Sequence, residues 1–80
     1  ELSGNIVKAP MLGTFYAAPS PDKTPFVKIG DTVKKGYVSM RIESMKLMNE
    51  IQSDYDGVVD SILVSDVQTV EFDQPVMVIK

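Results

Sequence analysis

The hydrophobic positions along the chain fall into short valine-rich runs that are separated by turn-forming residues. The run GVVDSILV (57–64) follows the turn signal DYDG, and PVMVIK (75–80) is a second such run. The stretch KIGDTVKKG (28–36) places two glycines around a valine. Short strands with regularly spaced turns are typical of β-sandwiches and barrels. The pattern therefore predicts an all-β fold.

The two halves of the chain also resemble each other. Residues 30–43 align with residues 67–80, and residues 10–15 align with residues 54–59. The alignment predicts two similar β-halves, although valine-rich segments can also match by chance. The matched positions are Gly13 with Gly57, Thr32 with Thr69, Val33 with Val70, Met40 with Met77, and Ile42 with Ile79.

The first half carries a longer connection than the second. Its extra segment, YAAPSPDKTPF (16–26), contains Pro19, Pro21 and Pro25. Proline fixes φ and has no N–H to donate, so this segment cannot join a central strand. We expect a stiff protruding loop, with an ordinary long turn as the plainer alternative.

The segment IESMKLMNEI (42–51) is ambiguous. Its Met, Leu, Lys and Glu residues favour a helix, in which apolar side chains would recur every third position and Lys46 would be a solvated charge. The repeat predicts a hairpin instead, because residues 39–43 match a strand-like segment. Lys46 would then lie at the tip, beside exposed apolar neighbours of the kind that usually have a binding partner.

Composition narrows the chemistry for this single small domain of 80 residues. The absence of cysteine and histidine excludes disulfides, zinc–thiolate sites and the usual nucleophile–base pairs. A net charge of −3 argues against a nucleic-acid surface, and no apolar run approaches the roughly 18 residues of a membrane span. Asp54 and Asp56 are interpreted as solvated turn formers. We therefore expect no catalytic site, no metal, no nucleic acid and no membrane.

The stretch ESMKLMNEI (43–51) resembles the attachment motif of biotinyl domains, in which a lysine is flanked by methionine. APMLGTFY (9–16), GDTVKKG (30–36) and VEFDQPVMVI (70–79) resemble the paired strand-and-turn segments of the same family. APSPDKTPF (18–26) resembles the thumb, a loop present in the biotin carboxyl carrier proteins of bacterial and plastid acetyl-CoA carboxylases.

The resemblance implies a flattened barrel of two quasi-symmetric four-stranded antiparallel sheets. It implies a domain over residues 6–80 after a linker stub at residues 1–5, with the biotinylated hairpin at about residues 39–53. Lys46 would carry biotin, and the biotin protein ligase would recognise the turn. The implied turn residues are Glu43, Ser44, Met45 and Leu47, and the implied thumb residues near biotin are Ala18, Pro19, Ser20, Pro21, Asp22, Lys23, Thr24 and Pro25.

The function that this resemblance implies is that of a carrier and not of an enzyme. The domain would move carboxylate from a biotin carboxylase to a carboxyltransferase, for malonyl-CoA formation in fatty acid biosynthesis. Its location would be the bacterial cytoplasm or the plastid stroma. A lipoyl carrier, whose motif usually reads D-K-A, and an unmodified interaction module are the alternatives.

Four residues depart from the family pattern. Ser44 replaces the usual alanine, and Tyr37 and Arg41 stand where other residue types are expected. Val67 replaces the glycine that would match Gly30. If that turn needs a positive φ, we expect a β-branched residue there to be strained by roughly 1–3 kcal/mol.

Overall fold

The computed structural model describes residues 4–80 and forms strands joined by turns and loops over that range. Residues 1–3 of the expected linker stub lie outside the described residues. Within the described range, no helix has the length and apolar character needed to cross a membrane. The strands are β1 (Asn5–Lys8), β2 (Gly13–Tyr16), β3 (Thr32–Val33), β4 (Val38–Ser44), β5 (Leu47–Gln52), β6 (Gly57–Ile62), β7 (Thr69–Val70) and β8 (Pro75–Ile79).

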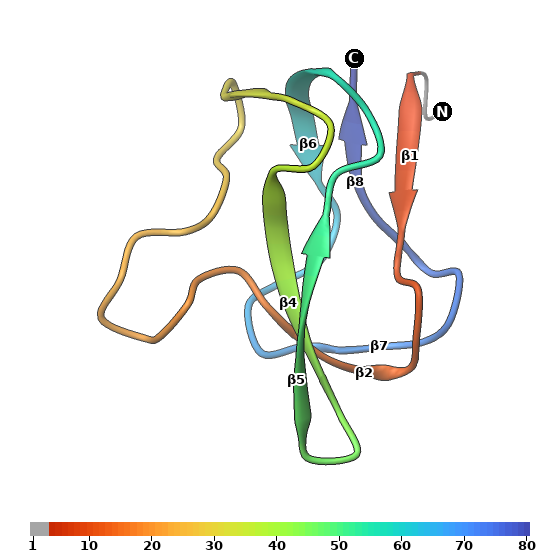
Figure 1. Cartoon of the computed structure of the whole chain (residues 1–80). Helices are drawn as coiled ribbons and strands as arrows, with labels where there is room; N and C mark the ends of the chain where they lie inside the picture. Colours follow the sequence, from red (N-terminus) through yellow and green to blue (C-terminus); the bar gives the residue numbers. More distant parts are fainter. Residues whose placement is uncertain (1–3) are drawn as a thin grey trace.

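The strands form two four-stranded sheets, with the orders β1-β8-β6-β3 and β5-β4-β2-β7. All of the pairings are antiparallel. In Figure 1, β6 and β8 lie behind β4 and β5, and the tip of the β4–β5 hairpin is at the bottom of the view. The all-β flattened barrel predicted from the sequence is confirmed.

The internal repeat corresponds to a structural repeat of the two sheets. When β1 to β4 are exchanged with β5 to β8, each sheet order becomes the other. Met40 and Ile42 of β4 match Met77 and Ile79 of β8, and all four side chains are buried in one core. Residues that align between the two halves of the sequence therefore occupy equivalent buried positions in the two sheets.

Two matched glycines allow neighbouring strands to approach closely. A Cβ atom at Gly13 would clash with the backbone oxygen of Glu43 in β4, and one at Gly57 would clash with the backbone oxygen of Lys80. Both glycines begin a strand, β2 and β6 respectively. The approach at Gly13 presses β2 against the part of β4 that leads into the hairpin.

Val67 adopts the left-handed backbone conformation, with φ of 67°. Its counterpart in the repeat, Gly30, has φ of 96°. The turn therefore requires a positive φ in both halves, and the second half meets it with a β-branched residue. The positive φ on which the expected strain depends is confirmed.

We expect Val67→Gly to raise the free energy of unfolding by about 1 kcal/mol, because glycine adopts this φ without a steric cost. Val67 is 59% exposed, so little packing is lost. Urea unfolding followed by circular dichroism measures the effect. Val67→Ala keeps a Cβ and should gain less than the glycine variant. An unchanged or lower midpoint for Val67→Gly would contradict the strain.

Candidate functional site

The candidate site is the tip of the β4–β5 hairpin. Ser44 pairs with Leu47, so the loop consists of the two residues Met45 and Lys46. Their φ angles are 52° and 65°. Positive φ at both central residues is the pattern of a type I′ turn, whose twist suits a two-residue hairpin. This turn usually selects Asn-Gly, so a Met-Lys pair is held there against its backbone preference.

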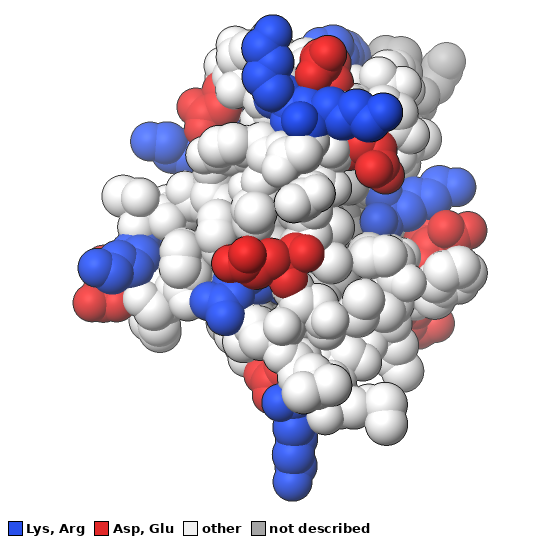
Figure 2. All heavy atoms as spheres, in the orientation of Figure 1, with Lys and Arg blue, Asp and Glu red and all other residues white. Residues whose placement is uncertain are grey.

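The side chains at this tip lie in solvent. Met45 is 92% exposed and Leu47 is 69% exposed, and Lys46 is also exposed. In Figure 2 one basic side chain projects from the hairpin end of the molecule, next to uncharged atoms. Among residues 4–80 the ion pair found is Lys80 with Asp60, so Lys46 has no carboxylate partner in the described structure. The tip presents an amine flanked by apolar groups.

The helix that local propensity favours for residues 42–51 is not formed. Ile42 is buried, but Met48 is 43% exposed and lies on the edge strand β5. The side-chain amide of Asn49 donates across the hairpin to the Ile42 carbonyl oxygen (3.2 Å) and, within β5, to the Leu47 carbonyl oxygen (3.3 Å). Cross-strand pairing and this bridge replace the helical hydrogen bonds.

Glu43 is engaged below the tip and forms no ion pair with Lys46. The Tyr16 hydroxyl donates to Glu43 Oε1 at 3.0 Å, which ties β2 to β4. This hydrogen bond raises the pKa of Tyr16, and burial and the charges of Glu43 and Asp66 act in the same direction. The contact stabilises the fold below the ordinary tyrosine pKa and is lost as the pH rises through the raised value.

The thumb is the loop at residues 18–26, between β2 and β3. Its tip is shaped by internal bonds: the Ser20 hydroxyl donates to Asp22 Oδ1 at 2.6 Å, and the Lys23 N–H donates to the Ser20 carbonyl at 3.1 Å. The hydrogen bond from Ser20, followed by a backbone hydrogen bond, lowers the pKa of Asp22. The loop projects beside the sheets in Figure 1.

A hollow of about 280 Å³ lies between the thumb and the hairpin sheet. Four of the expected thumb residues line one side of this hollow, and its lining also includes Met48, which is two residues beyond Lys46. Arg41 of β4, Asp66 and the strained Val67 complete its wall. Its lining is Tyr16, Ala18, Pro19, Ser20, Pro21, Arg41, Met48, Asp66 and Val67. The expected thumb residues Asp22, Lys23, Thr24 and Pro25 lie outside this lining.

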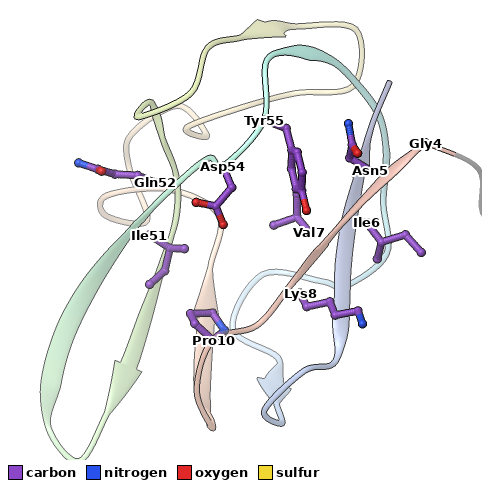
Figure 3. A pocket seen from close by; sticks show the side chains of 10 residues that line it. All are labelled: Gly4, Asn5, Ile6, Val7, Lys8, Pro10, Ile51, Gln52, Asp54 and Tyr55. Carbon is purple, nitrogen blue, oxygen red and sulfur yellow. The ribbon is translucent and has the colours of Figure 1, made fainter.

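A larger hollow of about 470 Å³ lies elsewhere, between β1 and the end of β5 (Figure 3). Its lining includes Lys8, Asp54 and Tyr55, and none of the residues expected to carry function. The described residues contain no group of three or more carboxylates that could hold a metal ion. Asp56 is exposed and accepts a hydrogen bond from the Lys35 N–H at 2.7 Å, a contact with a loop 21 residues away and not one within its own turn.

Sequence reasoning did not find the side chains that support the thumb. Arg41 Nη1 donates to the Pro19 carbonyl at 2.8 Å, and the Tyr37 hydroxyl donates to the Phe26 carbonyl at 3.1 Å. Asp66 accepts a hydrogen bond from the Ala17 N–H at 2.9 Å. In the sequence, Tyr37 and Arg41 were noticed only because they depart from the family pattern. That departure was the one feature of the sequence that could have pointed to their contacts with the thumb.

Comparison with known proteins gives a family match over nearly the whole chain. The model of the biotin–lipoyl family, described as biotin-requiring enzyme, matches residues 5–79. The chain is 50% identical over 80 residues to the biotin carboxyl carrier protein of acetyl-CoA carboxylase from Haemophilus influenzae, covering 100% of this chain and 52% of the relative.

Two further relatives carry similar names. The chain is 49% identical over 79 residues to the biotin carboxyl carrier protein of acetyl-CoA carboxylase from Pseudomonas aeruginosa, covering 99% of this chain and 51% of the relative. It is 50% identical over 74 residues to the chloroplastic biotin carboxyl carrier protein of acetyl-CoA carboxylase 1 from Arabidopsis thaliana, covering 92% of this chain and 26% of the relative. The chain thus spans about half the length of the bacterial relatives.

We expect Met45→Asn to raise the free energy of unfolding by about 1 kcal/mol, because asparagine tolerates the left-handed conformation better than methionine does. The 92% exposure of Met45 means that no core contact is lost. Thermal or urea unfolding measures the change. Leu47→Asn replaces a neighbouring exposed residue within β5 and serves as the control, which should not stabilise the chain. A destabilised Met45→Asn variant would contradict the prediction.

We expect Ser20→Ala to raise the pKa of Asp22 toward its ordinary value, because the hydroxyl that stabilises the carboxylate is removed. The contact is present above the ordinary pKa and is lost as the pH falls through the lowered one. An NMR titration of the Asp22 carboxyl carbon measures both values. Ser61→Ala, in β6, is the control. The assignment fails if the Asp22 titration is the same with and without Ser20.

Proposed function

The chain belongs to the biotin–lipoyl family of biotin-requiring enzymes, and from this membership we propose that it carries biotin covalently on Lys46. The single observation that supports this site most strongly is the two-residue turn that places Lys46 at the outermost point of the hairpin. The larger assembly that the domain serves would be an acetyl-CoA carboxylase, as the names of its relatives indicate.

The residues at the tip fit covalent attachment. An attached group needs an amine that can enter another protein's active site without displacing a structural contact. Lys46 is exposed, and Glu43 is occupied by Tyr16 and not by the lysine. The buried residues of β4 anchor the hairpin behind the turn, so the tip enters a partner site as a rigid projection.

The attachment step is the acylation of the Lys46 amine. An ammonium group has no free electron pair, so Lys46 must lose a proton before it attacks the carboxyl of biotinyl-adenylate, which forms the amide bond and releases AMP. A free lysine has a pKa of about 10.4, and no histidine exists in the chain to accept that proton. We assign the base and the activation to a biotin protein ligase. Once bound, biotin supplies a ureido nitrogen that accepts and releases carboxylate.

The neighbours of Lys46 would serve recognition by the ligase. Met45 and Leu47 offer exposed apolar surface on both sides of the lysine, and Glu43 and Ser44 lie on the strand leading to the turn. An exposed apolar pair on a rigid tip gives a partner a compact target with little ordering cost. The thumb residues Ala18 to Pro25 would lie near the attached group, and the hollow between thumb and sheet supports that placement.

In this role the domain is a carrier that contributes tethering and no bond-making. The partners would be a biotin carboxylase, which loads carboxylate, and a carboxyltransferase, which passes it to acetyl-CoA for malonyl-CoA formation in fatty acid biosynthesis. The bacterial and chloroplastic relatives support a location in the bacterial cytoplasm or the plastid stroma.

The test is the intact mass of the chain after incubation with biotin, ATP and a biotin protein ligase. We expect a gain of one biotin less one water, and fragmentation of the product should place it on Lys46. Lys46→Arg keeps the charge and the long side chain, so it is the matched control and should show no gain.

The proposal fails if a folded chain gains no mass in this assay or gains it equally in the Lys46→Arg variant. A parallel incubation with lipoate and a lipoyl ligase separates the related chemistry. A gain in the lipoyl reaction alone would assign the domain to lipoyl carriers. No gain in either reaction would leave an unmodified interaction module.

A further inference from the structure

The thumb is tied to the barrel very unevenly. Its base is well secured, since the Phe26 N–H donates to the Ala17 carbonyl at 2.8 Å and both side chains pack against the core. Tyr37 and Asp66 add the hydrogen bonds to the base described above. Between residues 18 and 25 the support is different, because these residues are mostly exposed and three of them are prolines.

One hydrogen bond joins this outer part of the thumb to the barrel within residues 4–80. It runs from Arg41 Nη1 to the Pro19 carbonyl, at 2.8 Å. The bonds among Ser20, Asp22 and Lys23 shape the tip but do not reach the sheets. The prolines cannot donate, so the thumb has few means of its own to attach.

Arg41 makes this bond although an acidic residue is its cross-strand partner. It is directly opposite Glu50 in the β4–β5 pairing, yet the two side chains form no ion pair in the described structure. Arg41 Nε is buried and has no hydrogen-bond partner. A buried donor without a partner is unfavourable, so the Nη1 bond to the Pro19 carbonyl is the contact that stabilises this conformation within the described residues. It places the guanidinium between the hairpin sheet and the thumb.

We propose that Arg41 is a positioning residue that holds the thumb over the hairpin sheet and thereby keeps the hollow between them open. The alternation of β4 makes this placement direct: Met40 and Ile42 face the core, and Arg41 faces outward between them. The hollow extends from Pro19 to Met48, on the hairpin that carries Lys46. That the hollow receives the group on Lys46 rests on the function proposed above, whereas the tether itself does not.

The first experiment uses the chain without any attached group. Arg41→Met keeps the length of an apolar stem but removes the donor. We expect the backbone ¹⁵N order parameters of Ser20, Asp22 and Lys23 to fall from about 0.85 to below about 0.6, while those of β4 and β8 stay unchanged. Trypsin cleavage after Lys23, which is exposed at the tip, should become about tenfold faster, as loss of a charge-assisted hydrogen bond implies.

Lys80→Met is the matched control, because it removes a cation that pairs with Asp60 on the barrel, away from the thumb. It should leave thumb order and Lys23 cleavage unchanged. Thumb order that is equal in Arg41→Met and the unsubstituted chain would overturn the tether. Loss of order spread evenly over thumb and strands would also overturn it, since Arg41 would then support the whole fold.

The second experiment uses the chain loaded with biotin on Lys46. Amide chemical shifts of the thumb should change on loading in the unsubstituted chain and should not change in Arg41→Met. Loading itself is read from the mass and should be equal in both. Absence of a thumb shift in the loaded, unsubstituted chain would overturn the link between thumb and attached group. Failure to load would instead count against Lys46 as the acceptor and leave the first experiment untouched.

Discussion

The burial of β4 is the constraint on which the rest of the structure depends. β4 lies between β5 and β2 in its sheet, and its Met40 and Ile42 side chains are buried in the core, where side chains of this kind contribute roughly 1.5–3 kcal/mol each when removed from water. In a domain of 80 residues that is a large share of the total stability. The same strand continues past the core into the hairpin and directs Arg41 and Glu43 outward to the thumb and to Tyr16. Core, turn and thumb therefore share one register, and a slip of one residue would misplace all three.

Three of the four non-glycine residues with positive φ within residues 4–80 lie in the hairpin turn or in the lining of the hollow beside it. Met45 and Lys46 form the exposed turn with positive φ, and Val67 lines the hollow under the thumb. Asp73 also has a positive φ, and its counterpart in the repeat is Gly36. Aspartate adopts this conformation more readily than other residues, whereas Met45, Lys46 and Val67 each cost about 1 kcal/mol or more, which a small domain tolerates only where the surrounding pairing enforces the conformation. The close approach of β2 at Gly13 supplies part of that enforcement beside the hairpin.

The fold was predictable because the same pattern of core and turn residues occurs in both halves of the sequence. Met40 and Met77 align in the sequence and occupy matching core positions, and the same comparison of Val67 with Gly30 predicted the strained turn. The hairpin was predictable only by letting this repeat override the local preference for helix. The supports of the thumb were not predictable. Arg41 reaches Pro19 from 22 residues away by a bond to a backbone oxygen, and such a contact leaves no periodic trace and requires no particular residue type at the acceptor.

The position of the chain ends relative to the hairpin has a mechanical consequence. β1 begins and β8 ends at the side of the molecule opposite the hairpin tip in Figure 1, and the molecule measures 32 Å along its longest axis. A connection made at either end therefore acts on Lys46 through a lever nearly as long as the whole body. A small pivot at the attachment point becomes a wide sweep of the lysine, so the rigid barrel enlarges the volume that the tip can explore without any bending of its own.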